Sequence, residues 1–205
     1  MDNKKVKGYA YGVIASVSYG LNPLFALPLY ASGIRVDSVL FYRYVFALLF
    51  LAVMMKMSGQ SFALKRNEIL PVAVMGLLFS FSSLFLFQSF NYMDAGIAST
   101  ILFMYPVLVA VIMAVFFKER LSVVKIASIA TAFVGISMLY KGEGGATLSM
   151  TGVCLVLMSS LTYALYIVGV NRSSLKEMPG LKLTFYAILF GSLVYIVRLR
   201  GGMDL

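Results

Sequence analysis

Long apolar runs separated by short polar segments make up most of the chain. A helix needs roughly 20 mostly apolar residues to cross a bilayer, because lipid offers no partner for an unpaired backbone N–H or C=O. Seven runs approach or exceed this length: Tyr9 to Tyr30, Val39 to Met55, Ile69 to Phe90, Ala95 to Phe117, Val123 to Tyr140, Thr151 to Val170 and Leu183 to Leu199. Strands of a membrane barrel would instead show segments of about ten residues with alternating polarity. The pattern therefore predicts an all-α fold, a polytopic transmembrane helix bundle with seven spans.

The composition agrees with a membrane protein. Of all residues, 61% are apolar and 12% are charged, whereas a soluble domain averages about 45–50% apolar and about 25% charged residues. This composition excludes a soluble domain and a disordered chain, and it makes the lipid bilayer the main partner. The net charge is +9, but the basic residues form short clusters between the apolar runs. Such clusters are typical of membrane topology signals, so no nucleic-acid partner is expected.

Few side chains are available for covalent chemistry. The chain contains no histidine and a single cysteine, Cys154, within an apolar run. Cys/His metal sites, Ser–His–Asp triads and internal disulfides therefore lack their components, and neither a metal nor another cofactor is expected. An intramembrane hydrolase or transferase is a rival interpretation, in which carboxylates near span ends, such as Asp37 and Asp94, would act as bases. We favour a protein that is not an enzyme.

The positions of Lys and Arg predict the orientation, because cytoplasmic segments near span ends are enriched in both. The amino-terminal tail and the second, fourth and sixth connections each contribute three basic residues, whereas the first, third and fifth contribute one, none and one. The amino terminus is therefore expected in the cytoplasm and the end of the seventh span outside. Arg198 and Arg200 at that outer end go against the rule. A cleaved signal peptide is an alternative for the first run, although its apolar stretch of about 22 residues is longer than usual.

An internal repeat emerges when the chain is compared with itself at an offset of 144 residues. The first two predicted helices then fall on the sixth and seventh without a gap. Identical pairs are Gly8 and Gly152, Ser16 and Ser160, Tyr19 and Tyr163, Leu21 and Leu165, Phe41 and Phe185, Tyr42 and Tyr186, and Phe46 and Phe190. Because five helices make an odd number of crossings, a second copy would enter the membrane from the opposite side. Shared membrane composition is the alternative explanation of these identities.

The repeat predicts two units. Residues 1–143 would form one five-helix repeat, and residues 144–205 would be the start of a second, incomplete copy with two helices. Inverted repeats recur in secondary transporters, where the substrate site lies between the halves near the middle of the bilayer. The incomplete copy leaves two explanations open: a truncated fragment, or a partner such as a second copy in a homodimer that supplies the missing C-terminal helices.

Polar residues in the first and sixth predicted helices are candidates for a substrate cavity. Pro23 interrupts the hydrogen bonds of the first helix directly after a polar face, so side chains there can meet freed carbonyls or a ligand. That face carries Ser18, Tyr19 and Asn22, and the repeat places Thr162, Tyr163 and Tyr166 opposite them. The alternative is that Asn22 only satisfies the kink at Pro23. Glycine and serine at four-residue intervals on the first helix, from Gly8 to Gly20, predict a close-packing face.

Three other helices add candidates. Arg43 lies inside the second run, where a charge is costly unless it reaches the interface or faces protein or water. It is expected either to attract an anionic or carboxylate-bearing solute or to extend to the outer interface. Gln88 in the third helix offers both donors and acceptors and is preferred over the nearby serines, which often bond to their own helix. Tyr105 and Pro106 lie near the middle of the fourth helix, where the proline favours a bend or hinge, and Glu119 ends that helix as a surface or gate residue. Pro23 in the first helix is a hinge candidate for the same reason.

The stretch from Asn91 to Tyr140, NYMDAGIASTILFMYPVLVAVIMAVFFKERLSVVKIASIATAFVGISMLY, resembles the fourth and fifth helices of the EamA family in the drug/metabolite transporter superfamily. GLNPLF at residues 20–25 and FYRY at residues 41–44 are also similar to that family. The resemblance implies ten helices in two inverted five-helix repeats, cytoplasmic termini, and export or exchange of small metabolites such as amino acids through a central cavity. It also implies that Arg43, Pro106 and Glu119 matter for shape or gating. The chain departs from this pattern because helices eight to ten are absent.

These observations together predict a transporter of a small organic solute, such as an amino acid, a related metabolite or a drug. It is expected to be a multi-pass protein of the bacterial cell (inner) membrane that exports or exchanges its solute by alternating access. The cavity is expected between helices one, three, four and six. A non-transporting membrane subunit or an inactive truncated fragment is the alternative. No acidic residue lies well inside a predicted span, so a proton relay within these seven helices is not expected.

Overall fold

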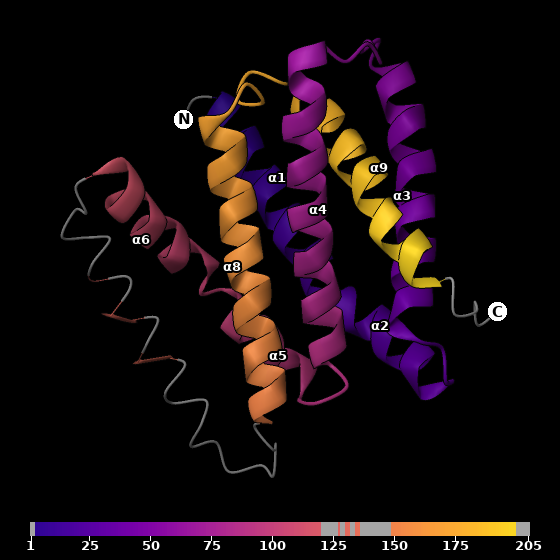
Figure 1. Cartoon of the computed structure of the whole chain (residues 1–205), viewed down its shortest axis with the longest axis vertical. Helices are drawn as coiled ribbons and strands as arrows, with labels where there is room; N and C mark the ends of the chain where they lie inside the picture. Colours follow the sequence, from indigo (N-terminus) through magenta and orange to yellow (C-terminus); the bar gives the residue numbers. More distant parts are fainter. Residues whose placement is uncertain (1–2, 120–126, 128–129, 132–133, 136–148, 200–205) are drawn as a thin grey trace.

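The computed structural model describes residues 3–119, 127, 130–131, 134–135 and 149–199. Most of the fifth predicted run, Val123 to Tyr140, lies outside the described residues. The described residues form helices and no strands (Figure 1): α1 (Asn3–Gly20), α2 (Asn22–Ala31), α3 (Val36–Met57), α4 (Arg66–Ser89), α5 (Ala95–Leu102), α6 (Tyr105–Phe117), α8 (Met150–Arg172) and α9 (Gly180–Arg198). Six stretches among them are long and apolar enough to cross a membrane. The predicted all-α fold of membrane helices is thus confirmed, and six of the seven expected spans fall in this part of the chain.

Two of these stretches are broken near a proline. In the first, α1 ends at Gly20, α2 begins at Asn22, and Pro23 lies in the first turn of α2. In the fourth, α5 ends at Leu102, α6 begins at Tyr105, and Pro106 lies in its first turn. A proline has no N–H to donate and its ring clashes with the preceding turn, so it is favoured at a helix start and weakens a helix elsewhere. Each expected single helix is therefore two shorter helices in the structure.

Helix α4 is at the centre of the bundle and packs against α8 and α9, and α3 packs against α9 (Figure 1). Two glycines bring α4 and α9 close together. A Cβ atom added to Gly191 would lie 2.0 Å from Ser80 Oγ and 2.8 Å from the carbonyl oxygen of Gly76. On the other side of α4, Ser82 Oγ lies 3.0 Å from the carbonyl oxygen of Ser159, and Ser159 Oγ donates to that of Ser82 at 2.7 Å. These contacts make α3, α4, α8 and α9 a tightly packed unit.

The close-packing face expected on the first helix has no such role among the described residues. A Cβ atom added to Gly8, Gly12 or Gly20 would have no neighbouring atom within 4 Å. Helix α1 contacts mainly α2, and its large side chains are exposed, as for Tyr9 at 73%. The corresponding face of α8 does pack: Gly152 and Ser160 are buried, and Ser160 Oγ lies 3.2 Å from the carbonyl oxygen of Leu102. Among the described residues, small side chains thus form a packed interface on α8 but not on α1.

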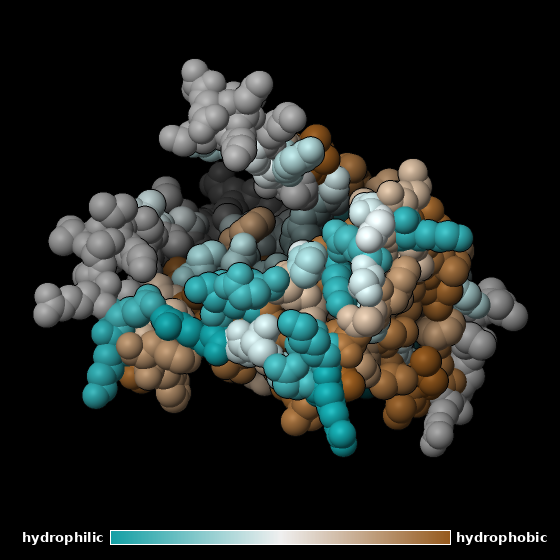
Figure 2. Space-filling view, turned by 90° about the horizontal axis from the view of Figure 1, so that it is seen from above, coloured by the Kyte–Doolittle hydropathy of each residue, from teal (hydrophilic) through white to brown (hydrophobic). Residues whose placement is uncertain are grey.

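The helices alternate in direction. The start of α1, the turn between α3 and α4, and the turn between α8 and α9 lie at one end of the bundle (Figure 1). Figure 2 looks onto this end, where hydrophilic residues gather, while hydrophobic residues cover much of the sides. Arg198 lies at the opposite end, where it was not expected from the charge rule. Its Nε donates to Asp37 Oδ1 at 2.7 Å and its Nη2 to Oδ2 at 3.1 Å, so its charge is paired there.

Candidate functional site

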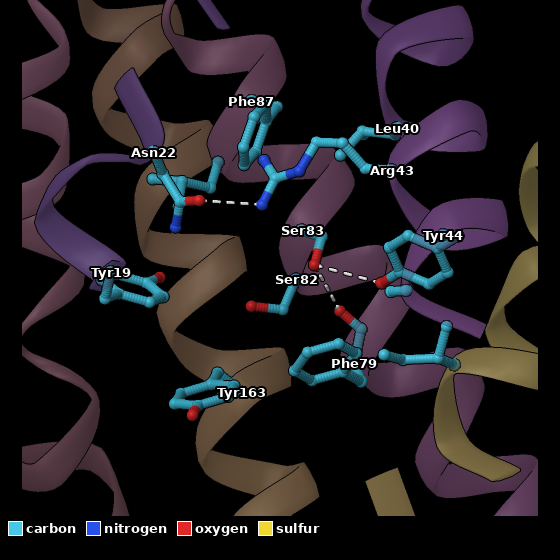
Figure 3. Close-up of a pocket in the computed structure, with 13 residues that line it drawn as sticks. Tyr19, Asn22, Leu40, Arg43, Tyr44, Phe79, Ser82, Ser83, Phe87 and Tyr163 are labelled. Atoms are coloured by element: carbon cyan, nitrogen blue, oxygen red, sulfur yellow. Dashed lines mark hydrogen bonds between the residues drawn. The ribbon is translucent and has the colours of Figure 1, made fainter. Parts of the chain in front are cut away.

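A cavity of about 230 Å³ lies inside the helical bundle (Figure 3). It is lined by both parts of the first span, by α3 and α4, and by α8 and α9. The lining residues are Tyr19, Asn22, Leu40, Arg43, Tyr44, Ala47, Phe79, Ser82, Ser83, Leu86, Phe87, Tyr163 and Ile188. Three of the four helices expected around the cavity, the first, third and sixth, therefore line it. The second predicted helix, α3, and the seventh, α9, also line it, and the fourth does not.

Among the residues that the structure describes, Arg43 is the one charged side chain in this lining. Its Nη2 donates a hydrogen bond to Asn22 Oδ1 at 2.8 Å, and its guanidinium lies 4.5 Å from the centre of the Phe87 ring (Figure 3). A cation over an aromatic face is attracted by the electron-rich ring. These contacts hold the guanidinium against the Asn22 amide and the Phe87 ring.

The break in the first span brings Asn22 to the cavity. Asn22 is the first residue of α2, directly after the break at Leu21. Tyr19, near the end of α1, lies on the same side of the cavity, so the two halves of the broken span each contribute one polar side chain (Figure 3). The break at Leu21 thus lies beside the cavity lining.

A hydrogen-bonded network forms the wall below Arg43. The hydroxyl of Tyr44 donates to Ser83 Oγ at 3.2 Å, and Ser80 Oγ donates to the Tyr44 hydroxyl at 3.2 Å. The fully buried Tyr195 donates from its hydroxyl to the carbonyl oxygen of Ser80 at 2.9 Å. Buried polar side chains whose hydrogen bonds are all satisfied keep a single conformation, because any other would leave a buried group without a partner. The network therefore fixes two lining residues, Tyr44 and Ser83, through Ser80 and Tyr195, which lie outside the lining.

Aromatic rings form the opposite part of the lining. The Tyr163 ring on α8 meets the Tyr105 ring edge to face at 4.8 Å between centres. It also contacts Phe79 at 6.3 Å and Tyr166 at 5.9 Å. Tyr105 is the first residue of α6. It does not line the cavity itself, but its ring contacts Tyr163, which does. The site therefore combines one cation, several hydroxyl and amide groups, and aromatic surface.

The structure brings together four of the nine cavity candidates: Tyr19, Asn22, Arg43 and Tyr163. Tyr105 and Tyr166 are not in the lining, but the rings of both contact that of Tyr163. The Thr162 hydroxyl donates to its own helix, at 2.9 Å to the carbonyl oxygen of Met158. Ser18 is exposed, and Gln88 is half-buried outside the lining.

The three hinge and gate candidates lie at the ends of broken or terminal helical segments. Pro23 and Pro106 occupy the first turns of α2 and α6. Glu119 forms an ion pair with Arg172, whose guanidinium lies 4.5 Å from the centre of the Phe117 ring. This pair joins the end of α6 to the end of α8, away from the cavity.

Sequence reasoning missed Tyr44, Phe79, Ser82, Ser83 and Phe87, although a signal was available. The cavity residues of α3 are 40, 43, 44 and 47, and those of α4 are 79, 82, 83, 86 and 87. Residues three and four apart share one face of a helix. Steps of three and four residues from Arg43 along its helix reach Leu40 and Ala47, and Tyr44 lies four residues after Leu40. The α4 face carries aromatic and serine residues together, which a search for a single strong donor such as Gln88 overlooks.

Neither a metal nor a nucleophile-and-base pair is evident among the described residues. No group of three or more His, Cys, Asp or Glu there is placed to hold a metal ion. The two carboxylates considered as bases are engaged elsewhere: Asp37 with Arg198, and Asp94 as a cap that accepts from the backbone N–H of Gly96 at 2.8 Å. Neither carboxylate lines the cavity. The geometry is suited to binding a small molecule by charge, hydrogen bonds and ring contacts.

Comparisons with a family model and with curated proteins all match this chain to transporters. Residues 6–141 match the model of the EamA-like transporter family. A protein of Bacillus subtilis named "Uncharacterized transporter YxxF" is 29% identical over 131 residues, which are 62% of this chain and 42% of that protein. An "Uncharacterized transporter" of Archaeoglobus fulgidus is 28% identical over 102 residues, 50% of this chain and 36% of that protein. The B. subtilis "Uncharacterized transporter YvbV" is 27% identical over 131 residues, 61% of this chain and 43% of that protein.

The chain therefore aligns with about two fifths of the length of these curated relatives. No solved structure matches it at a comparable level.

Proposed function

The chain belongs to the EamA-like transporter family, and from this premise we propose that it moves a small organic metabolite across the bacterial inner membrane by alternating access. The proposal includes a cytoplasmic amino terminus. Because the chain aligns with about two fifths of its relatives' length, the proposal extends to a complete transporter assembled with further helices or with a second copy.

The observation that carries the proposal is the composition of the cavity wall. Residues from both ends of the chain meet there, and two pairs of them are related by the 144-residue offset. Tyr19 and Tyr163 form one pair, and Tyr44 and Ile188 form the other. A site between repeat-related helices near the middle of the bilayer is the usual arrangement in secondary transporters. The location of the cavity thus supports both the repeat and the transport function.

The direction of the helices gives further support. The first span and α8 run in opposite directions through the bundle, and so do α3 and α9 (Figure 1). An inverted repeat requires this antiparallel relation between matching helices. The tightly packed α3, α4, α8 and α9 would act as the fixed part. The broken first and fourth spans, whose segments can change angle at Pro23 and Pro106, would supply the movement.

A steric block of the cavity tests the transport function. Ala47 lines the cavity, so Ala47→Phe would fill it, whereas Val53→Phe adds a ring at a 55% exposed position of the same helix. Bacterial cells producing each form would be fed ¹³C-labelled glucose, and labelled solutes inside and outside the cells would be measured by mass spectrometry. Relative to cells that lack the protein, we expect wild type and Val53→Phe to change the external amount of at least one small metabolite. We expect Ala47→Phe to abolish that change.

Equal membrane abundance of the three forms is the control for folding. If wild type and Ala47→Phe gave the same solute profile at equal abundance, transport through this cavity would be refuted. That result would favour a non-transporting subunit. Repeating the measurement with tandem-linked copies would then test whether a homodimer is the active form.

A further inference from the structure

The positive charge of Arg43 has no acidic partner among the described residues. Five of the eight acidic residues are described, and each lies or binds elsewhere. Asp37 pairs with Arg198, Glu119 pairs with Arg172, Asp94 caps α5, Glu68 accepts from the backbone N–H of Lys65 at 3.1 Å, and Glu177 lies between α8 and α9 outside the lining. The other three, Asp2, Glu143 and Asp204, lie outside the described residues. A charged side chain within a membrane span usually pairs with another charge or lies on a substrate path.

The surroundings of the guanidinium leave room for one acceptor of matching shape. An arginine carries five N–H donors in a planar fork. One described hydrogen bond uses this fork, from Nη2 to Asn22 Oδ1, and the Phe87 ring supports the guanidinium 4.5 Å from its centre. A carboxylate has two oxygens spaced to accept two parallel N–H bonds from such a fork, and these charge-assisted bonds are stronger than the bond to a neutral amide.

We propose that Arg43 binds the carboxylate of a singly charged organic acid, and that this carboxylate replaces the Asn22 amide oxygen as its acceptor. The inference deepens the proposed function, on which it rests, by naming the chemical class of the solute. It also links binding to the broken first span, because Asn22 begins α2. Release of Asn22 from Arg43 would free the start of α2 to move.

The rest of the lining explains why the solute carries a single charge. Apart from Arg43, every lining residue in the described part of the chain is neutral, so a second negative charge would lack a second cation there. The ammonium group of an amino acid would likewise find no carboxylate in the described lining. The body of the solute would meet apolar and aromatic surface from Leu40, Leu86 and Phe79. A monocarboxylate with an apolar body is therefore preferred over a zwitterion or a phosphate.

Four probes of similar size separate these classes: 3-phenylpropionate, its neutral amide 3-phenylpropionamide, the zwitterion phenylalanine, and phenyl phosphate. Each would be titrated into the purified full chain in nanodiscs, with the midpoint of thermal unfolding as the measure of binding, because a ligand stabilises the state it binds. We expect 3-phenylpropionate to bind at least about tenfold more tightly than the other three. The amide lacks the negative charge, phenylalanine adds an ammonium group without a partner, and phenyl phosphate adds a second negative charge without a partner.

Asn22→Asp is the sharpest variant, because it replaces one oxygen-bearing side chain by another of the same shape. The new carboxylate would pair with Arg43 and compete with the probe. We expect the unliganded variant to be at least as stable as wild type, and its affinity for 3-phenylpropionate to fall at least about tenfold. Asn91→Asp, at an exposed position after α4, makes the same chemical change outside the cavity and should leave binding unaltered.

Arg43→Gln should remove the preference for the carboxylate over the amide, while Arg43→Lys, which keeps the charge but loses the fork, should retain part of it. Equal binding of carboxylate and amide by wild type would overturn the inference. Tighter binding of phenylalanine or phenyl phosphate than of 3-phenylpropionate would also overturn it. Both results would leave the proposed transport function standing. Absence of binding by all four probes would overturn it too. The steric block at Ala47 tests transport separately, because it needs no assumption about the solute's charge.

Discussion

Gly191 shows how one residue controls helix packing in this protein. Its missing side chain lets α9 approach the backbone of α4 at Gly76. Within a bilayer, helices associate through close packing and hydrogen bonds rather than through the hydrophobic effect, so small residues at an interface contribute directly to stability. The buried hydroxyl of Tyr195, four residues later, donates to α4 at the same interface.

Gly191→Ala should therefore destabilise the bundle. The added Cβ would lie 2.8 Å from the backbone oxygen of Gly76, which cannot rotate away as the Ser80 side chain can. Overpacking of this kind typically costs about 1–3 kcal/mol. Reversible unfolding in mixed micelles would measure the free energy of unfolding. Gly180→Ala on the same helix, where an added Cβ has no neighbour within 4 Å, is the matched control, and equal stability of both variants would contradict the expected interface.

For single residues, the sequence predicted some of the cavity positions but not the contacts that those residues make. Arg43 stands out because a charge inside an apolar run is rare, and Asn22 because it precedes a proline. Their hydrogen bond depends on how α2 and α3 pack against each other, which no local pattern records. Gln88 illustrates the opposite case: its amide is suited to a cavity, but its place on α4 turns it outside the face formed by Ser82, Ser83 and Phe87.

The helices as elements were largely predictable, because lipid demands long apolar runs. The run from Ile69 to Phe90 corresponds to α4, and that from Thr151 to Val170 to α8. The breaks within the first and fourth spans follow from Pro23 and Pro106, whose chemistry is local. Which helices surround the cavity was less predictable, because the angle between α5 and α6 depends on tertiary contacts with α8.

Pro106→Ala should straighten the fourth span. Alanine restores the missing N–H, so α5 and α6 can join into one helix, in which residues 100 and 111 would be about 16 Å apart between Cα atoms. Spin labels at Thr100→Cys and Val111→Cys, in a Cys154→Ser background, would report the distance by pulsed or continuous-wave spectroscopy. We expect it to lengthen toward that value. Pro28→Ala with the same labels is the control, and an unchanged distance in Pro106→Ala would mean that packing on α8 holds the bend.

The ion pair between Asp37 and Arg198 joins the start of α3 to the end of α9, and its energy can be measured. Two parallel hydrogen bonds favour it, but the Arg198 side chain is 46% exposed, so solvent weakens the attraction. A double-mutant cycle with Asp37→Asn and Arg198→Gln should give a coupling energy of about 0.5–1 kcal/mol. Strict additivity of the two single variants would mean that the pair adds nothing to the contact of these helices.

For the whole molecule, charge and packing lead to the same arrangement. The connections rich in Lys and Arg, between α3 and α4 and between α8 and α9, lie at one end of the bundle (Figure 1). Contacts join them: Lys182 donates to the carbonyl oxygen of Ala63, and Tyr186 to that of Phe62. A sequence rule about loop charge and the packing of the helices thus agree on which loops share a side. The rule says nothing about these specific contacts, which depend on the ends of α3, α4 and α9 meeting.

The sidedness of the loops can be tested on the intact chain. In a Cys154→Ser background, Ser58→Cys and Ser174→Cys lie in exposed turns at one end of the bundle, and Ser32→Cys lies in the exposed turn after α2 at the other. The charge rule assigns the first two to the cytoplasm. A membrane-impermeant maleimide should therefore label Ser32→Cys in whole cells, but Ser58→Cys and Ser174→Cys only after permeabilisation. An amino-terminal epitope tag should be protected from protease together with the latter two. If the tag and Ser174→Cys were reached from opposite sides, the first span and α8 could not be antiparallel partners, and the proposed inverted repeat would fail with them.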